Sequence, residues 1–290
     1  MKTAILTDTN SGILTKEAES LGIHVMPMPV LIDDEVYFEG ESITEEEFYS
    51  ALTGGRNVST SQPSPGDVLD TWDRLFSEGY DQIVYIPMSS GLSSSCMTAK
   101  GYAQDDYEGK VFVADNHRIS VTLRTAVLGA KKMADRGEDG KSIAEFLEKD
   151  AYNSSIYLAV DTLDYLKKGG RVSSAAAALG TLLSIKPILT IQGEKLEPFA
   201  NMRGSMKRCQ EKMLDALKDD VARRFADVDP EKILVGLTGA GLSEEEEAEW
   251  MKMGREAFPK AQLFFDPLSA SVVAHTGPGA VGLGVSADNE

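Results

Sequence analysis

Short apolar runs alternate with amphipathic stretches along the first half of the chain, and this alternation constrains the fold more than any other feature. Four runs are predicted to be buried strands bounded by turn residues: Ala4 to Leu6, Gln82 to Ile86, Val111 to Ala114 and Ile156 to Val160. The stretch after Ser64 has helical spacing, with Val68, Leu69, Trp72, Leu75 and Phe76 on one face. Strands that alternate with helices in this way predict parallel βαβ units.

Several helices are expected to begin at recognisable capping residues. The spacing of a capping box occurs at Thr44 with Glu47, at Ser142 with Glu145, and at Ser243 with Glu246. Ser64 precedes Pro65, which places a capping hydroxyl before a proline suited to the first helical position. These signals predict where four helices begin.

The pattern changes after about residue 161. An alanine-rich helix over 174–183 precedes two apolar runs, 186–192 and 195–199, that flank a Gly-Glu turn and predict a β-hairpin. The remaining expected elements are a helix over 204–225, a strand over 233–238, an acidic helix over 243–258, a strand over 263–266, and strands on either side of a glycine-rich loop. We therefore expect an α/β protein of two domains. Residues 1–160 form a parallel three-layer α/β/α domain, residues 161–290 form a mixed-sheet α/β domain, and the crevice between them is the natural ligand site.

Charge and cysteine content exclude several classes of function. The chain has 290 residues, with 46 acidic and 29 basic side chains and a formal charge of −17, which disfavours nucleic acid and anionic membranes as partners. Cys96 and Cys209 are isolated, so neither a zinc site nor a disulfide framework is predicted. No apolar segment is long enough for a signal peptide or a membrane span. We expect a soluble, unprocessed cytoplasmic protein without a metal.

Three loops rich in hydroxyls and glycine stand out. They are residues 59–67 (STSQPSPGD), residues 89–95 (SSGLSSS) and residues 274–284 (AHTGPGAVGLG), the last of which is expected directly after a strand. Loops that expose hydroxyls and backbone N–H groups at strand ends are typical anion-binding elements of α/β proteins. Together they predict a site that binds an anionic group.

Two further segments accompany these loops: Thr7-Asp8-Thr9-Asn10-Ser11 and residues 166–172 (LKKGGRV). The five segments have the sequences and the order of motifs in the bacterial DegV family, which the chain resembles along almost its whole length. The resemblance implies a protein that binds a long-chain fatty acid between its domains. It further implies that the protein presents the carboxyl group to a separate ATP-binding fatty acid kinase subunit, which makes an acyl phosphate for phospholipid synthesis. No activity alone and no cofactor of its own are expected, since ATP and Mg would come with the partner.

The first two loops carry the implied carboxyl contacts. Thr60 and Ser61 precede the expected helix at Ser64, where ordinary capping chemistry remains the alternative to ligand binding. By resemblance, Thr60 holds the carboxyl group, and so does Ser93, next to Ser94. The usual family continuation after Gly-Leu-Ser is Gly-Thr, so a side chain at position 94 is expected to narrow the approach of the head group to the backbone.

Arg171 and the glycine-rich loop carry the implied phosphoryl-transfer support. Arg171 follows Gly169 and Gly170, so it is either a cation at a helix C-terminus or a guanidinium beside the crevice. His275 is either a core or loop histidine or, with Thr276 and Gly277, part of the head-group site, as the resemblance implies.

Other positions keep open interpretations. Asp8 is either a cap on the following helix or a polar group near the crevice, and the segment from Asp115 to Ser120 is assigned no role. Apolar residues available for an acyl chain are Met26, Met28, Leu92, Leu179, Leu183 and Ile188. Two other functions remain: a serine hydrolase, although no G-x-S-x-G motif occurs, and a substrate-binding phosphotransfer subunit for a small ketone or sugar.

Overall fold

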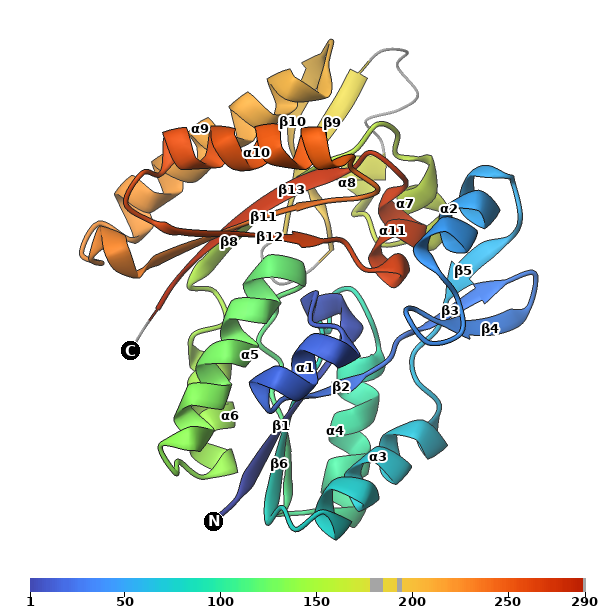
Figure 1. The fold of residues 1–290 in the computed structure, drawn as a ribbon, viewed down its shortest axis with the longest axis vertical. Helices are drawn as coiled ribbons and strands as arrows, with labels where there is room; N and C mark the ends of the chain where they lie inside the picture. The colour runs from blue at the N-terminus through green and yellow to red at the C-terminus, as the bar shows by residue number, and fades with distance from the viewer. Residues whose placement is uncertain (178–184, 192–194, 289–290) are drawn as a thin grey trace.

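The computed structural model describes residues 1–177, 185–191 and 195–288. Two sheets lie one above the other, with a small third sheet beside them (Figure 1). The lower sheet consists of β1 (Thr3–Asp8), β2 (His24–Met26), β6 (Gln82–Ile86) and β7 (Val111–Val113) in the order β2-β1-β6-β7, and all its pairs are parallel. Three of the four predicted strands are therefore confirmed in a parallel sheet.

Helices cover both faces of this sheet. On one face α3 (Pro65–Ser77) and α4 (Ser95–Asp106) pack on Ala4 and Leu6 of β1. On the other, α1 (Thr15–Leu21), α5 (Ser120–Asp135) and α6 (Gly140–Lys149) pack around Ile5. Successive strand residues point to opposite faces, so a strand buried on both sides must be apolar throughout. The expected three layers are confirmed.

Three of the four predicted helix starts are confirmed. Thr44 and Glu47 form a capping box at α2 (Glu45–Thr53), as Ser243 and Glu246 do at α10 (Glu244–Ala257). Ser64 caps α3, with Pro65 as its first residue.

The prediction at Ser142 was wrong, because α6 (Gly140–Lys149) is capped by Asp139 and begins three residues earlier than a cap at Ser142 would place it. The side chain of Asp139 accepts hydrogen bonds from the backbone N–H groups of Lys141 and Ser142 and from the Ser142 hydroxyl. A carboxylate accepts more hydrogen bonds at a helix start than a hydroxyl can, and here it takes the capping position.

A small antiparallel sheet was not predicted. It consists of β3 (Pro29–Ile32), β4 (Glu35–Phe38) and β5 (Val58–Thr60) in the order β4-β3-β5. With α2 it forms a lobe at the side of the molecule (Figure 1). Its strands are only three or four residues long, which is too short for a sequence period to identify them.

The upper sheet has six strands and is mixed. Its order is β10-β9-β8-β13-β11-β12, built from β8 (Ser154–Ala159), β9 (Ile185–Thr190), β10 (Glu197–Arg203), β11 (Ile233–Gly239), β12 (Gln262–Pro267) and β13 (Val281–Ala287). Only β11 and β12 are parallel. The expected pairing of residues 186–192 with 195–199 is confirmed by β9 and β10, whereas the turn itself lies outside the described residues.

Strand β8 belongs to this upper sheet. We grouped residues 156–160 with the parallel strands, but β8 pairs antiparallel with β13 and β9. An apolar run has the same residue pattern in a parallel sheet and in a mixed sheet, so the sequence could not predict which strands β8 pairs with. The alanine-rich helix predicted over 174–183 is seen as α8 (Ser174–Ala177), and its remainder lies outside the described residues.

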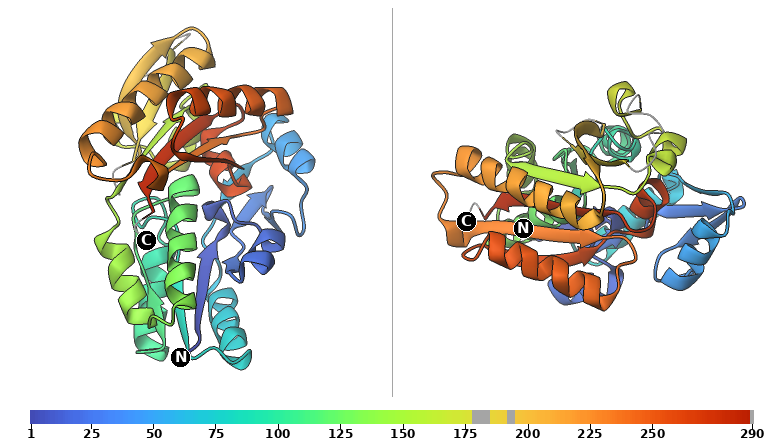
Figure 2. Two further views of the ribbon diagram at one scale, coloured as in Figure 1. Left: turned by 60° about the vertical axis from the view of Figure 1, so that its left-hand side comes forward. Right: turned by 90° about the horizontal axis from the view of Figure 1, so that it is seen from above.

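The two faces of the upper sheet meet different neighbours. One face packs against α9 (Met206–Arg224) and α10, which lie above it (Figure 2). The opposite face meets the start of α5, where Gly236 and Gly284 lie side by side in the register. A Cβ at Gly236 would lie 2.4 Å from Val121 Cβ, and one at Gly284 would lie 2.7 Å from Thr122 Cγ2. These glycines let α5 contact the sheet closely.

The residues before His275 form a helix, which corrects the expected strand. Helix α11 spans Ala270–Thr276, with backbone hydrogen bonds from Val273 N to Ser269 O and from Gly277 N to Val273 O. Two adjacent valines favour a strand only weakly, and tertiary packing overrides that preference here.

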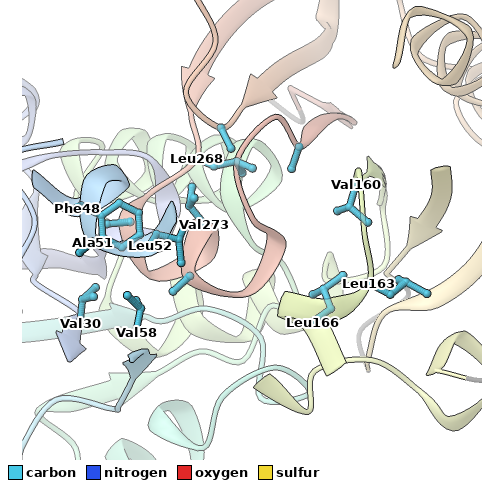
Figure 3. Close-up of a cluster of buried hydrophobic side chains, with 14 of the residues drawn as sticks. Val30, Phe48, Ala51, Leu52, Val58, Val160, Leu163, Leu166, Leu268 and Val273 are labelled. Atoms are coloured by element: carbon cyan, nitrogen blue, oxygen red, sulfur yellow. The ribbon is translucent and has the colours of Figure 1, made fainter. Parts of the chain in front are cut away.

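Helix α11 lies at the centre of a core cluster that joins the lobe to the upper sheet and the α7 region (Figure 3). Val273 of α11 is buried between Phe48 and Val58 on the lobe side and Leu163 and Leu166 of the α7 region (α7, Asp164–Gly169) on the other. The position of α11 therefore depends on both the lobe and the α7 region.

Both cysteines are buried free thiols, as expected from their isolation in the sequence. Within the described residues, none of the helices combines the length and the apolar character needed to cross a membrane.

Candidate ligand cavity between the sheets

A cavity of about 420 Å³ lies where the lower sheet, the lobe and the upper sheet meet. Its wall is mainly apolar, with Met28, Met88, Leu92, Ile119, Ile156, Leu158, Leu166, Leu189, Ile191, Leu196, Leu268 and Val272. Part of the wall comes from loops that follow β1 and β6, at the point where the strand order of the parallel sheet reverses. Open parallel sheets bind ligands at this switch point.

The polar part of the wall centres on a contact between Thr60 and His275. Thr60, the last residue of β5, has its Oγ1 atom 2.7 Å from Nε2 of His275, in the last turn of α11. Both side chains line the cavity. The predicted proximity of the first and third loops is thus present in the structure.

Gly169 leaves room for the His275 ring. A Cβ at Gly169 would lie only 2.0 Å from Nδ1 of His275, so the ring lies directly on the backbone at the end of α7. Burial, together with the smaller effect of the positive charge of Arg171, lowers the pKa of His275 from 6.5 to about 4. The imidazole is therefore neutral at pH 7 and has a hydroxyl, rather than a carboxylate, as its partner.

Arg171 lies both at a helix C-terminus and in the cavity wall, which are the two positions that the sequence left open. Gly170 ends α7 in the left-handed conformation, and the Arg171 guanidinium donates to the carbonyl oxygen of Gly169 at that helix end. Its Nε also donates to the carbonyl oxygen of Leu92 at 3.3 Å, which ties the α7 end to the loop before α4. Within the described part of the chain, Arg171 is the one Lys or Arg of the cavity wall, and its Nη2 has no protein partner.

Ser61, Ser93 and Ser94 also line the cavity. The Ser93 hydroxyl accepts a hydrogen bond from Ser95 N at 3.2 Å and donates to the Ser95 hydroxyl at 3.1 Å, so it already contacts the first residue of α4. Ser94 has φ −72 and ψ −10, a conformation open to any residue. Serine in place of the family's glycine therefore requires no backbone strain at this position.

The remaining predicted positions divide between the wall and its support. Thr276 is buried and lines the cavity, whereas Gly277 ends α11 under the Tyr165 ring and is absent from the described wall. Asp8 is fully buried behind the wall, where it accepts from Asn10 N and Met88 N, both at 2.9 Å. Burial raises its pKa to about 6. It thus caps the turn after β1 and joins that turn to the loop after β6.

Sequence reasoning missed several polar wall residues, among them Asn10, Ser271 and Ser120. Asn10 Oδ1 accepts from the hydroxyls of Ser271 and of Ser269, the latter at 3.0 Å, and so links the lower sheet to the start of α11. Asn10 belongs to the Thr7–Ser11 motif, so the sequence contained a signal that could have identified it as a wall residue. Ser120 lies in the segment to which no role was assigned.

The predicted acyl-chain residues are only partly in the wall. Met28 and Leu92 line the cavity, whereas Met26 is in the core between the lower sheet and α3, and Ile188 faces α9. Leu179 and Leu183 lie outside the described residues. No group of three His, Cys, Asp or Glu side chains that could hold a metal ion occurs in the described ranges.

Comparison with known proteins identifies the family. Residues 2–288 match the family model described as "Uncharacterised protein, DegV family". A DegV domain-containing protein of Streptomyces coelicolor is 32% identical over 98% of both chains. A DegV family protein from Thermus thermophilus, described as fatty acid binding, superposes with a TM-score of 0.86 at 29% identity, covering 99% of this chain and all of the other. DegV of Bacillus subtilis, described as a fatty acid binding protein, gives the same TM-score at 25% identity and covers 99% of both chains. With this fold, these loops and a match over nearly its full length, the chain belongs to the DegV family.

Proposed function

We propose that this protein binds a long-chain fatty acid in the cavity between its two sheets. The observation that carries the proposal is the composition of the wall as far as the structure describes it, which is apolar over most of its area and has Arg171 and a Thr–His pair among its polar groups. A fatty acid has the matching chemistry, with one negative charge and a long apolar chain. The related structures described as fatty acid binding support the same ligand class.

The carboxylate is proposed to lie between Arg171, Thr60 and Ser93. Arg171 has donors left on Nη2 after its two backbone contacts, and a guanidinium binds a carboxylate well. A neutral His275 beside Thr60 orients that hydroxyl without adding charge. Burial of the acyl chain supplies most of the affinity, at about 0.8 kcal/mol per methylene, so the polar groups mainly orient the head group.

Ligand extraction tests this function directly. Protein purified from bacteria is denatured, extracted with organic solvent and analysed by mass spectrometry. We expect a long-chain fatty acid at close to one per chain. Recovery of a sugar phosphate or a nucleotide in place of lipid would overturn the proposal.

The protein is further proposed to act as a substrate subunit rather than as an enzyme. A carboxylate oxygen of the bound acid would attack the γ-phosphorus of ATP held with Mg by a separate kinase subunit in the cytoplasm. The bond from that phosphorus to ADP breaks, and an acyl phosphate forms. Arg171 stabilises the negative charge that accumulates during the transfer.

The two alternative functions fit the wall less well. Within the described residues, the His275 ring lies against Thr60 and Gly169, and the charge of Arg171 lowers its pKa. No carboxylate is among these groups, whereas the histidine of a hydrolase triad needs an acidic partner. A small ketone or sugar would leave most of the apolar wall without a partner.

A further inference from the structure

A second, smaller cavity adjoins the main one. Its volume is about 10 Å³, which leaves room for about one water molecule. The two cavities meet at the side chains of Ile119, Ile156 and Ile191, which line both of them. The wall of the smaller cavity also includes His117 and Tyr152, which do not line the main cavity. An apolar chain that fills the main cavity can therefore continue past the three isoleucines toward these two rings.

Strand β8 runs from one cavity to the other. Leu158 lines the main cavity, Ile156 lines both, and Ser154 lines the smaller one. These alternate residues point to the same face of the strand, and each is about 7 Å from the next along it. Beyond Leu158 the chain continues to α7 and to Arg171 of the proposed head-group site, whereas Tyr152 lies just before the other end of β8. A fatty acid with its carboxylate at Arg171 therefore extends its chain along β8 toward Tyr152.

The rings of His117 and Tyr152 stack on each other in the wall of the smaller cavity. Their centroids are 5.2 Å apart and their planes differ by 20°. Tyr152 is 53% exposed, so the stacked pair lies between the smaller cavity and solvent. His117 belongs to the segment from Asp115 to Ser120, to which the sequence assigned no role. The pair is placed where it limits how far an acyl chain can extend.

Hydrogen bonds hold the backbone around Tyr152 in place. The buried Arg118 guanidinium donates to the carbonyl oxygens of Asp150, at 2.5 Å, and of Ala151, at 3.3 Å. Arg224 donates to the carbonyl oxygen of Tyr152 itself. Rotation of the exposed Tyr152 side chain is therefore the smallest change that opens the smaller cavity to solvent. An aromatic contact contributes about as much free energy as burial of one or two methylenes, so a longer acyl chain can displace the ring.

We propose that the stacked pair of Tyr152 and His117 is a gate that determines the chain-length specificity of the protein. Fatty acids that fit within the main cavity leave the gate closed. Longer ones displace the Tyr152 ring and extend their methyl end past it, so they bind at the cost of the stacking contact. This inference rests on the proposed fatty-acid binding and adds the residues that select the length of the acyl chain.

The three histidines of the chain allow the position of the chain end to be followed by NMR. Delipidated protein is loaded with saturated fatty acids of increasing length, from dodecanoic to docosanoic acid, and the histidine ring protons are recorded. We expect the His117 signal to be unchanged by the short acids and to shift from one threshold length onward, because loss of the stacked Tyr152 ring removes its ring current. His275, at the head group, should shift with every acid.

His24 is the internal control, because it lies on β2, outside the described walls of both cavities, and its signal should stay constant. A His117 signal that is the same with every bound acid, short or long, would overturn the gate while leaving fatty-acid binding intact. Failure of all the acids to bind would instead overturn the proposed function.

Tyr152→Ala removes the ring that closes the gate. Acids longer than the threshold should bind this variant about three- to tenfold more tightly than the wild type, and shorter acids equally well, measured by displacement of a fluorescent fatty acid. Ser154→Phe fills the smaller cavity and should weaken only the longer acids. Tyr80→Ala is the matched control, because the rings of Tyr80 and His24 also have centroids 5.2 Å apart but lie outside the described cavity walls. An unchanged length profile in Tyr152→Ala, or an equal change in Tyr80→Ala, would contradict the proposal.

Discussion

Thr60 Oγ1 lies 2.7 Å from His275 Nε2, although 215 positions separate the two residues in the chain. The contact joins the last residue of a short strand in the lobe to the last turn of α11, and both side chains face the cavity. Neither segment alone distinguishes a binding residue from an ordinary loop residue. Their pairing beside the only Lys or Arg of the described wall makes this region the proposed head-group site.

Replacement of Thr60 should weaken fatty-acid binding. Thr60→Ala removes a hydroxyl from a desolvated site, so we expect a loss of roughly 1–3 kcal/mol in binding free energy, measured by fluorescent fatty-acid titration. Ser59→Ala is the control, because Ser59 precedes Thr60 on β5, is exposed and points to the opposite face. Wild-type affinity in the folded Thr60→Ala variant would place the head group elsewhere.

A methyl group at position 169 should displace the His275 ring. The Cβ of Gly169→Ala would lie 2.0 Å from Nδ1, so the ring must move and its contact with Thr60 must break. We expect fatty-acid affinity to fall by about tenfold while the protein stays folded, because the contact with Thr60 orients the head group. Gly129→Ala in α5 has no atom within 4 Å of its new Cβ and should bind normally with slightly higher stability. Equal affinity in the two variants would contradict a role for the His275 ring position.

Arg171 and His275 should matter more for transfer than for binding. Arg171→Ala and His275→Ala are expected to bind fatty acid with affinity lower by about tenfold and to be fully loaded at high ligand concentration, because burial of the acyl chain dominates affinity, but to fail in acyl phosphate formation with a kinase subunit and ATP. Charge grows at the carboxyl only as the transfer proceeds. Occupancy is measured by mass spectrometry and product by phosphate transfer. Unaltered transfer rates at full occupancy would reduce both residues to structural roles.

Glu39 should make stability dependent on pH. Its carboxylate accepts a hydrogen bond from Ala270 N at 2.9 Å, and burial raises its pKa from 4.5 to about 7. The folded state therefore holds this proton more tightly than the unfolded state, and the protein loses stability as pH rises from about 4.5 to about 7.

Glu39→Gln keeps an acceptor for Ala270 N and removes the buried charge. The free energy of unfolding should rise by up to about 3 kcal/mol at pH 8 and stay near the wild-type value at pH 4, measured by urea denaturation at both pH values. The control is Glu46→Gln, at an exposed position of α2. A gain of the same size at both pH values would show that charge burial is not its cause.

Local signals were predicted best. The strands of the parallel sheet and the helix start at Ser64 depend on residue period and on contacts within a few positions, so the sequence identifies them. The signal at Ser142 failed because Asp139, also local, is the stronger cap. The membership of β8 in the mixed sheet depends on long-range pairing, which an apolar run does not encode.

The sequence by itself determined the composition of the site: hydroxyl-rich loops, one arginine after two glycines, and a histidine before a glycine-rich loop. Only the tertiary structure decided which of these groups meet. Helix α11, rather than a strand, turns His275 toward Thr60, and Gly169 makes the space for its ring. Contacts between distant segments are fixed by burial of the shared core, and local residue order does not specify them.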